Sequence, residues 1–242
     1  RPGVLGQRGR HRFGLSRSEI EPLDRHTTAV VEIELQIVLP AQPRKVIAHV
    51  AFDEATAMLA GDALQAEAFT VIANGALPAP QTASLMRELA HAAGTQGMCG
   101  GQAIDLSVVG RQISPAELER MHRMKTGALL KAAVLMGALS GQSALLTECT
   151  REALTRYGDA MGLAFQVVDD ILDVEGTTAD LGKTAGKDAA QSKPTYISVL
   201  GLDAARALSL RLRAQALEAV AGLGPRAARL RELADLIVCR NH

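Results

Sequence analysis

Three carboxylates lie close together in a strongly apolar segment, at a spacing suited to binding a metal ion. Asp169, Asp170 and Asp173 fall in the apolar run 163–174, and Gln166 comes one turn before them. Residues three and four apart share one face of an α-helix. The carboxylates would repel one another there and call for a counter-charge. Because hard cations bind oxygen ligands and bridge to phosphate, the stripe predicts a Mg²⁺ site. For an isolated acidic pair, a solvated helix face is the simpler alternative.

A segment rich in glycine and lysine follows the aspartates. Residues 175–194 contain Lys183, Lys187 and Lys193 together with three glycines. Glycines let the backbone approach a ligand closely, and lysines contact phosphate oxygens as point charges. Carboxylates, a metal ion and lysines together favour a diphosphate ligand. Lys125 stands alone among apolar neighbours, and a lysine stem lying along apolar surface would explain it equally well.

Composition limits the class of protein. The 242 residues are 48% hydrophobic but only 2% aromatic, which predicts one helical body with an aliphatic core. Twenty-six basic residues balance 26 acidic ones, so we expect no nucleic-acid partner. Three cysteines without CxxC spacing indicate neither a disulfide framework nor a zinc site, and favour the cytoplasm.

The longest apolar runs, such as 132–139, are too short for stable membrane insertion. No secretory signal is visible, and because the chain begins with Arg1 it is a candidate fragment.

Periodicity and breaker residues predict a series of helices. Ser114-Pro115-Ala116-Glu117 is typical of a capped helix start, and Thr82 or Ser84 is expected to cap the helix 85–93. Other predicted helices occupy 49–74 (one or two helices), the segment that follows the glycines at 94–101, 115–126, a further segment from Gly127 to 139, 144–174 (one or two helices), 196–200, 204–223 and 227–240.

Residues 1–48 do not fit this helical pattern. The first twenty positions are basic and glycine-rich, which predicts disorder. Residues 31–37 alternate apolar and polar side chains, the period of a β-strand, but no second strand is predicted to pair with them. We therefore expect residues 1–48 to be a disordered or aberrant segment and residues 49–242 to form a helical domain.

Assembled, these features resemble the short-chain trans-prenyl diphosphate synthases, of the bacterial farnesyl diphosphate synthase type. The resemblance extends from about residue 49 to the C-terminus. The family's first aspartate-rich motif is absent, because residues 38–48 contain no aspartate. The matching segments, in order, are 61–65, 100–106, Lys125-Thr126-Gly127, 165–173, Gly182-Lys183 and Lys193-Pro194-Thr195.

The resemblance implies an all-α, isoprenoid-synthase-type bundle around a central cavity, with a homodimer as the usual assembly. It implies a Mg²⁺-assisted prenyltransferase that ionises dimethylallyl or geranyl diphosphate and condenses it with isopentenyl diphosphate. Asp169 and Asp173 would hold metal, with Asp170 supporting them from the same face. Lys125 and Lys183 would bind the allylic diphosphate with Lys193 close by, and Thr126 and Gln166 would line the cation site.

Several assignments stay open at this point. Phe165 would border the isopentenyl pocket or belong to the core, and Asp62, Gln102 and Asp105 would more simply satisfy buried backbone groups. A degenerate, non-catalytic homologue acting as a partner subunit is one alternative function. A terpene cyclase is another, although the Lys125-Thr126-Gly127 segment and Lys183 favour chain elongation.

Overall fold

The computed structural model describes residues 50, 53–141, 146–175 and 193–240, and every regular element in these ranges is helical. The chain divides into two compact units, residues 1–71 and residues 72–242, which are described separately. The predicted strand at 31–37 lies outside the described residues. No helix in the described part of the chain is both long and apolar enough to cross a membrane.

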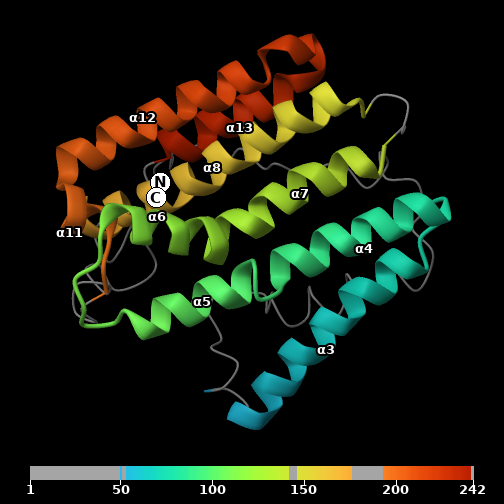
Figure 1. The fold of residues 1–242 in the computed structure, drawn as a ribbon, viewed down its shortest axis with the longest axis horizontal. Coiled ribbons are helices and arrows are strands. Elements are labelled where there is room, and N and C mark those ends of the chain that lie inside the picture. Colours follow the sequence, from blue (N-terminus) through green and yellow to red (C-terminus); the bar gives the residue numbers. More distant parts are fainter. Residues whose placement is uncertain (1–49, 51–52, 142–145, 176–192, 241–242) are drawn as a thin grey trace, which may run out of the picture. The chain divides into compact units, whose positions relative to one another are not determined.

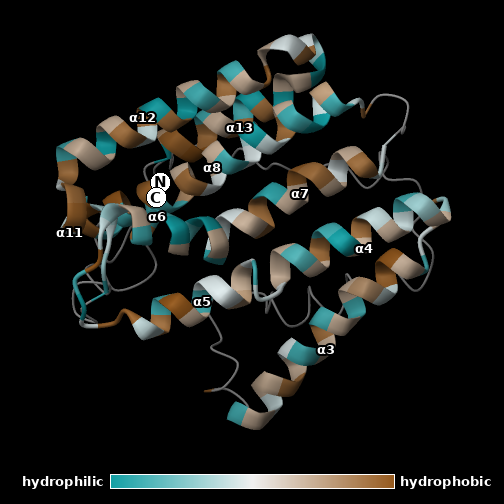
Figure 2. Ribbon diagram, viewed as in Figure 1, coloured by the Kyte–Doolittle hydropathy of each residue, from teal (hydrophilic) through white to brown (hydrophobic). Residues whose placement is uncertain are grey.

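The first unit contains most of helix α3 (Glu54–Ala73), so the structure has one helix where one or two were expected over 49–74. Its start is fixed by Asp53, whose carboxylate accepts the Thr56 N–H at 2.7 Å, as an N-cap residue does. Polar and apolar residues are mixed along this helix (Figure 2). None of its residues is buried, and Met58 and Leu59 are largely exposed. Among the described residues, helix propensity and the Asp53 cap are the interactions that support this helix.

The second unit is built entirely of helices within its described residues, which confirms the predicted all-α class (Figure 1). The elements are α4 (Ala79–Ala93), α5 (Met98–Ser107), α6 (Pro115–His122), the π-helical turn η1 (Arg123–Gly127), α7 (Ala128–Leu139), α8 (Glu148–Glu175), α11 (Tyr196–Leu200), α12 (Leu202–Ala219), the 3₁₀ segment η3 (Ala221–Ala227) and α13 (Ala228–Cys239).

Helix α8 is the central element of this unit. It packs against α7 and η1 and also against α12 and α13 (Figure 1). The core around it is mainly aliphatic, with Leu118, Leu163 and Val167 almost completely inaccessible to solvent. Tyr157 is an aromatic exception, and its hydroxyl donates to the Leu230 carbonyl at 2.7 Å, which ties α8 to α13. This central position lets one helix carry the aspartate stripe into the interior.

The helix boundaries test the predicted caps. The capping box at Ser114 is confirmed, because the Glu117 N–H donates to Ser114 Oγ at 3.2 Å and the Ser114 N–H donates to Glu117 Oε2 at 2.9 Å. The prediction of a cap at Thr82 or Ser84 is wrong. Helix α4 begins earlier, after Pro78, and both hydroxyls donate back to carbonyls four residues before them inside the helix.

Candidate active site

Lys125 and Thr126 lie on a π-helical turn inside one continuous helical stretch. The turn η1 joins α6 to α7, where an extra residue widens the helix, and such turns often occur at functional sites. Its last residue, Gly127, is buried against Gly162 of α8. A Cβ atom at Gly162 would lie only 2.6 Å from the Gly127 Cα atom. The two glycines therefore let the backbones of η1 and α8 approach closely.

This close approach brings two of the predicted site residues together. The Thr126 hydroxyl donates to Gln166 Oε1 at 3.4 Å, and Gln166 Nε2 donates to Asp170 Oδ1 at 2.9 Å. A chain of hydrogen bonds thus runs from the lysine-bearing turn η1 to the aspartate stripe on α8. The contact between Gln166 and Asp170 follows from helix geometry, because the two residues are one helical turn apart on α8.

The three aspartates lie at the C-terminal end of α8 in different surroundings. Asp170 is only 3% exposed, and its Oδ2 accepts the Tyr196 N–H at 2.7 Å. A carboxylate at the first turn of a helix is favourable, so Asp170 anchors the start of α11. Asp173 is also buried, whereas the Asp169 side chain is partly exposed and forms an ion pair with Arg240.

The stripe offers the oxygen donors that Mg²⁺ prefers, so its chemistry fits the predicted ion. Within the ranges that the structure describes, however, no three His, Cys, Asp or Glu side chains are grouped so as to hold a metal. The stripe alone therefore does not complete a metal site, and metal binding at these aspartates stays a prediction.

Arg240, just after α13, is a cation of the described part of the chain that contacts the stripe. It contacts the Asp169 carboxylate and donates to the Phe165 carbonyl at 3.0 Å. Its guanidinium carbon also lies 4.2 Å from the centre of the Phe165 ring, a cation–π contact. No sequence pattern singles out Arg240, because the contact joins residues 71 positions apart.

Two lysines converge on one buried carboxylate, that of Asp105 on α5. Lys125 Nζ donates to Asp105 Oδ2 at 2.7 Å, and Lys193 Nζ lies 3.8 Å from the same oxygen. The structure thus brings two of the three predicted diphosphate-binding lysines together, while Lys183 lies outside the described residues. This arrangement differs from the prediction that Asp105 satisfies backbone groups, because the carboxylate faces the two ammonium groups.

Helix α5 reaches the lysines because Gly101 leaves no side chain in the way. A Cβ atom at Gly101 would lie 2.1 Å from the Lys125 backbone nitrogen. Of the other residues that match the family, Gln102 is half-buried on α5 and Asp62 is exposed on α3.

His122 lies buried between the lysine cluster and α11. Burial, and after it the Lys125 charge, lower its pKa to about 4, while the Asp105 charge opposes the change. Its ring stacks on Tyr196, with centroids 5.4 Å apart and planes inclined by 29°. Burial is also the main cause that raises the pKa of the Tyr196 hydroxyl. Both side chains are therefore neutral at physiological pH, and their stacked rings lie next to the charged pair Lys125 and Asp105.

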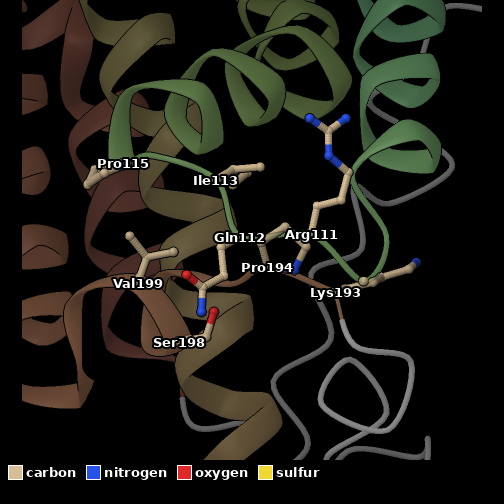
Figure 3. A pocket seen from close by; sticks show the side chains of 9 residues that line it. Arg111, Gln112, Ile113, Pro115, Lys193, Pro194, Ser198 and Val199 are labelled. Carbon is tan, nitrogen blue, oxygen red and sulfur yellow. The ribbon is translucent and has the colours of Figure 1, made fainter.

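A hollow of about 700 Å³ opens beside Lys193, between the loop that precedes α6 and the start of α11. Figure 3 shows the side chains of Gln112 and Ser198 pointing toward each other on one side of it. The side chains of Arg111 and Lys193 extend toward the other side (Figure 3). Of the lysine cluster, Lys193 therefore lines a polar, partly basic hollow.

Comparisons with known proteins show which family the chain resembles. The chain is 46% identical over 203 residues to the farnesyl diphosphate synthase of Escherichia coli, covering 80% of this chain and 66% of that protein. It is 52% identical over 186 residues to a Sinorhizobium fredii protein named "Probable farnesyl diphosphate synthase", covering 76% of this chain. The matched part is 56% of that relative, so the chain spans little more than half the length of such a protein.

A solved structure gives the same result. The geranyltransferase of Helicobacter pylori, complexed with magnesium and isoprenyl diphosphate, superposes with a TM-score of 0.69 at 31% identity. The superposition covers 79% of this chain and 62% of that one. The polyprenyl synthetase family model matches residues 44–221. The predicted resemblance is therefore confirmed, and the chain belongs to the polyprenyl synthetase family.

Proposed function

We propose that this chain is a trans-prenyltransferase that condenses an allylic diphosphate, dimethylallyl or geranyl, with isopentenyl diphosphate. One observation carries the proposal. A lysine cluster and an aspartate stripe are joined through Thr126 and Gln166 in a body that belongs to the polyprenyl synthetase family. Lysines suit the diphosphate, carboxylates suit its counter-ion, and the polar side chains between them suit a developing cation.

Binding of the allylic diphosphate is assigned to Lys125 and Lys193, together with Lys183. Asp169 and Asp173 would hold Mg²⁺, with Asp170 supporting them from the same face. When bound, Mg²⁺ supplies electrostatic stabilisation of the negative charge that develops on the leaving diphosphate. A structure of the H. pylori geranyltransferase with magnesium and isoprenyl diphosphate supports this choice of ion.

In the reaction, the allylic C–O bond breaks and the diphosphate leaves with the electron pair, next to the lysine ammonium groups. The oxygen dipoles of Thr126 and Gln166 face the resulting allylic cation and stabilise it without attacking it. The double bond of isopentenyl diphosphate then adds to the cation, and a proton passes to the released diphosphate. The chemistry needs no nucleophilic side chain.

Two other functions are less well supported. A non-catalytic partner subunit and a terpene cyclase were the alternatives, and nothing in the comparisons favours either. The homodimer and the cytoplasmic location remain predictions.

The test is condensation of geranyl diphosphate with isopentenyl diphosphate by the full chain, with and without Mg²⁺. We expect turnover that requires Mg²⁺ and that falls at least about a hundredfold in Asp169→Ala, the size of effect seen when one stabilising group is removed. Asp203→Ala is the matched control, because this α12 carboxylate is 99% exposed, and it should keep full activity. Mg²⁺-dependent diphosphate binding without turnover would contradict the proposal and favour the non-catalytic homologue.

A further inference from the structure

The two lysines of the cluster share a single oxygen atom. Lys125 comes from η1, and Lys193 comes from the segment just before α11, 68 positions later in the chain. Both ammonium groups are nevertheless directed to Asp105 Oδ2, at 2.7 and 3.8 Å. The two nitrogens can be no further apart than these two distances taken together. One diphosphate group can therefore contact both lysines.

The carboxylate that gathers them is fixed by its surroundings. Asp105 is 4% exposed and lies one helical turn after Gly101, which packs directly on the backbone of Lys125. A buried carboxylate is costly unless it is paired, so its position and its two partners stabilise one another.

Both lysine-bearing segments are held at their backbones as well. The turn η1 is fixed between α5 and α8 by the contacts of Gly101 and Gly127. The segment that begins with Lys193 is held three residues later, where the Tyr196 N–H donates to Asp170. Only the long, flexible lysine side chains remain to be ordered, and ordering such a side chain opposes ligand binding.

We propose that Asp105 is a positioning residue for the diphosphate site, a role that rests on the proposed function. Its carboxylate accepts a hydrogen bond from Lys125 and forms a longer ion pair with Lys193, so it keeps both side chains side by side. Each ammonium group has three donors, so those that remain are available to the phosphate oxygens. Asp105 does not contact the substrate and acts through Lys125 and Lys193.

The experiment is a double-mutant cycle on the full chain, with inorganic diphosphate as the probe in the presence of Mg²⁺ and calorimetry as the readout. The cost of Lys193→Met is measured in the wild-type chain and in Asp105→Asn. We expect this substitution to weaken binding about tenfold in the wild type, the effect of losing one charged contact. In Asp105→Asn we expect a loss of less than about threefold, because Lys193 is no longer directed to the ligand.

Other results would overturn the inference. An equal loss in both backgrounds would mean that Asp105 and Lys193 act independently. A larger loss in Asp105→Asn would mean that the carboxylate competes with the ligand for the lysine. Absence of diphosphate binding by the wild-type chain would overturn the proposed function as well, whereas wild-type binding with an additive cycle would overturn the inference alone.

A matched control and a second variant complete the design. Lys131 and Asp159 form a lysine–aspartate pair at 2.9 Å between α7 and α8, so Asp159→Asn should leave the cost of Lys193→Met unchanged. If Asp105→Asn shows no cooperative melting transition, the cycle is run with Asp105→Glu, which keeps the charge and moves it by one methylene. A reduced cost of Lys193→Met is expected there too, and an unreduced cost would overturn the inference.

Discussion

The aspartate stripe of α8 and the lysine cluster around Asp105 are assembled in opposite ways. The three aspartates come from one helix and lie on one face of it, and among the described residues Arg240, near the C-terminal end of the chain, forms an ion pair with Asp169. The lysine cluster combines residues from α5, η1 and the segment before α11, gathered by one buried carboxylate. The stripe is a local feature, whereas the cluster depends on packing of distant segments.

This difference indicates how each region should respond to mutation. A change in the packing of α5 against η1 should disperse the lysines and leave the stripe intact. A change at Arg240 should alter the charge that faces the stripe and leave the lysines in place. His122 and Tyr196 connect the two regions, because the histidine lies near Lys125 and the tyrosine N–H is held by Asp170.

The largest effect is expected from Gly101→Ala. Its Cβ atom would lie 2.1 Å from the backbone nitrogen of Lys125, a distance that real structures do not tolerate, so α5 and η1 would have to move apart. We expect a loss of about 3 kcal/mol in the free energy of unfolding, at the upper end of overpacking effects. Urea denaturation measures it, and binding of inorganic diphosphate should weaken in the fraction that remains folded.

Gly137→Ala provides the control within the same unit. Gly137 lies on α7, and a Cβ atom there would meet nothing within 4 Å. Alanine should therefore stabilise the helix by up to about 1 kcal/mol. If Gly101→Ala were as stable as Gly137→Ala, the close packing of α5 on η1 would not hold in solution.

Lowering the pH should reduce the free energy of unfolding through His122, which connects the two regions. Its pKa is about 4 in the folded chain, below its ordinary value of 6.5, so the unfolded chain takes up the proton first as the pH falls. The contribution of His122 to stability is complete above the higher value and is lost progressively between 6.5 and about 4. Lowering the pH from about 7.5 to about 5 should reduce the free energy of unfolding by roughly 2 kcal/mol through this residue.

His122→Phe isolates this contribution from that of the carboxyl groups. Phenylalanine keeps a ring against Tyr196 and removes two ring nitrogens that are buried without a hydrogen-bond partner among the described residues. Urea denaturation at both pH values should show a smaller acid loss in the variant than in the wild type. Equal losses would show that His122 is not buried in the neutral form.

The contrast between the regions also explains what the sequence predicts. Asp169, Asp170, Asp173 and Gln166 are recognisable because helical periodicity alone places them on one face. The role of Asp105 cannot be recognised from the sequence, because its partners lie 20 and 88 positions away and only the fold brings them together. The early start of α4 was missed for a related reason, since Thr82 and Ser84 are cap-forming residues whose hydroxyls here bond inside the helix.

The smallest effect is expected at the stripe, from Arg240→Gln. The guanidinium of Arg240 forms an ion pair with the Asp169 carboxylate, so a metal ion bound to that carboxylate would compete with it. Partly exposed ion pairs are worth up to about 1 kcal/mol, so the variant should bind Mn²⁺, a probe for Mg²⁺, up to about fivefold more tightly. Electron paramagnetic resonance of free Mn²⁺ measures this directly, without turnover.

Arg213→Gln is the control, because Arg213 forms a comparable pair with Asp235 between α12 and α13, and Asp235 is not a residue of the stripe. It should leave Mn²⁺ affinity unchanged. Weaker binding in Arg240→Gln would contradict competition and would mean that Arg240 holds the stripe in shape through its contacts with Phe165. Tighter binding would separate the two regions functionally. Asp105 would hold Lys125 and Lys193 ready for an incoming diphosphate, whereas Arg240 would compete with a metal ion for Asp169.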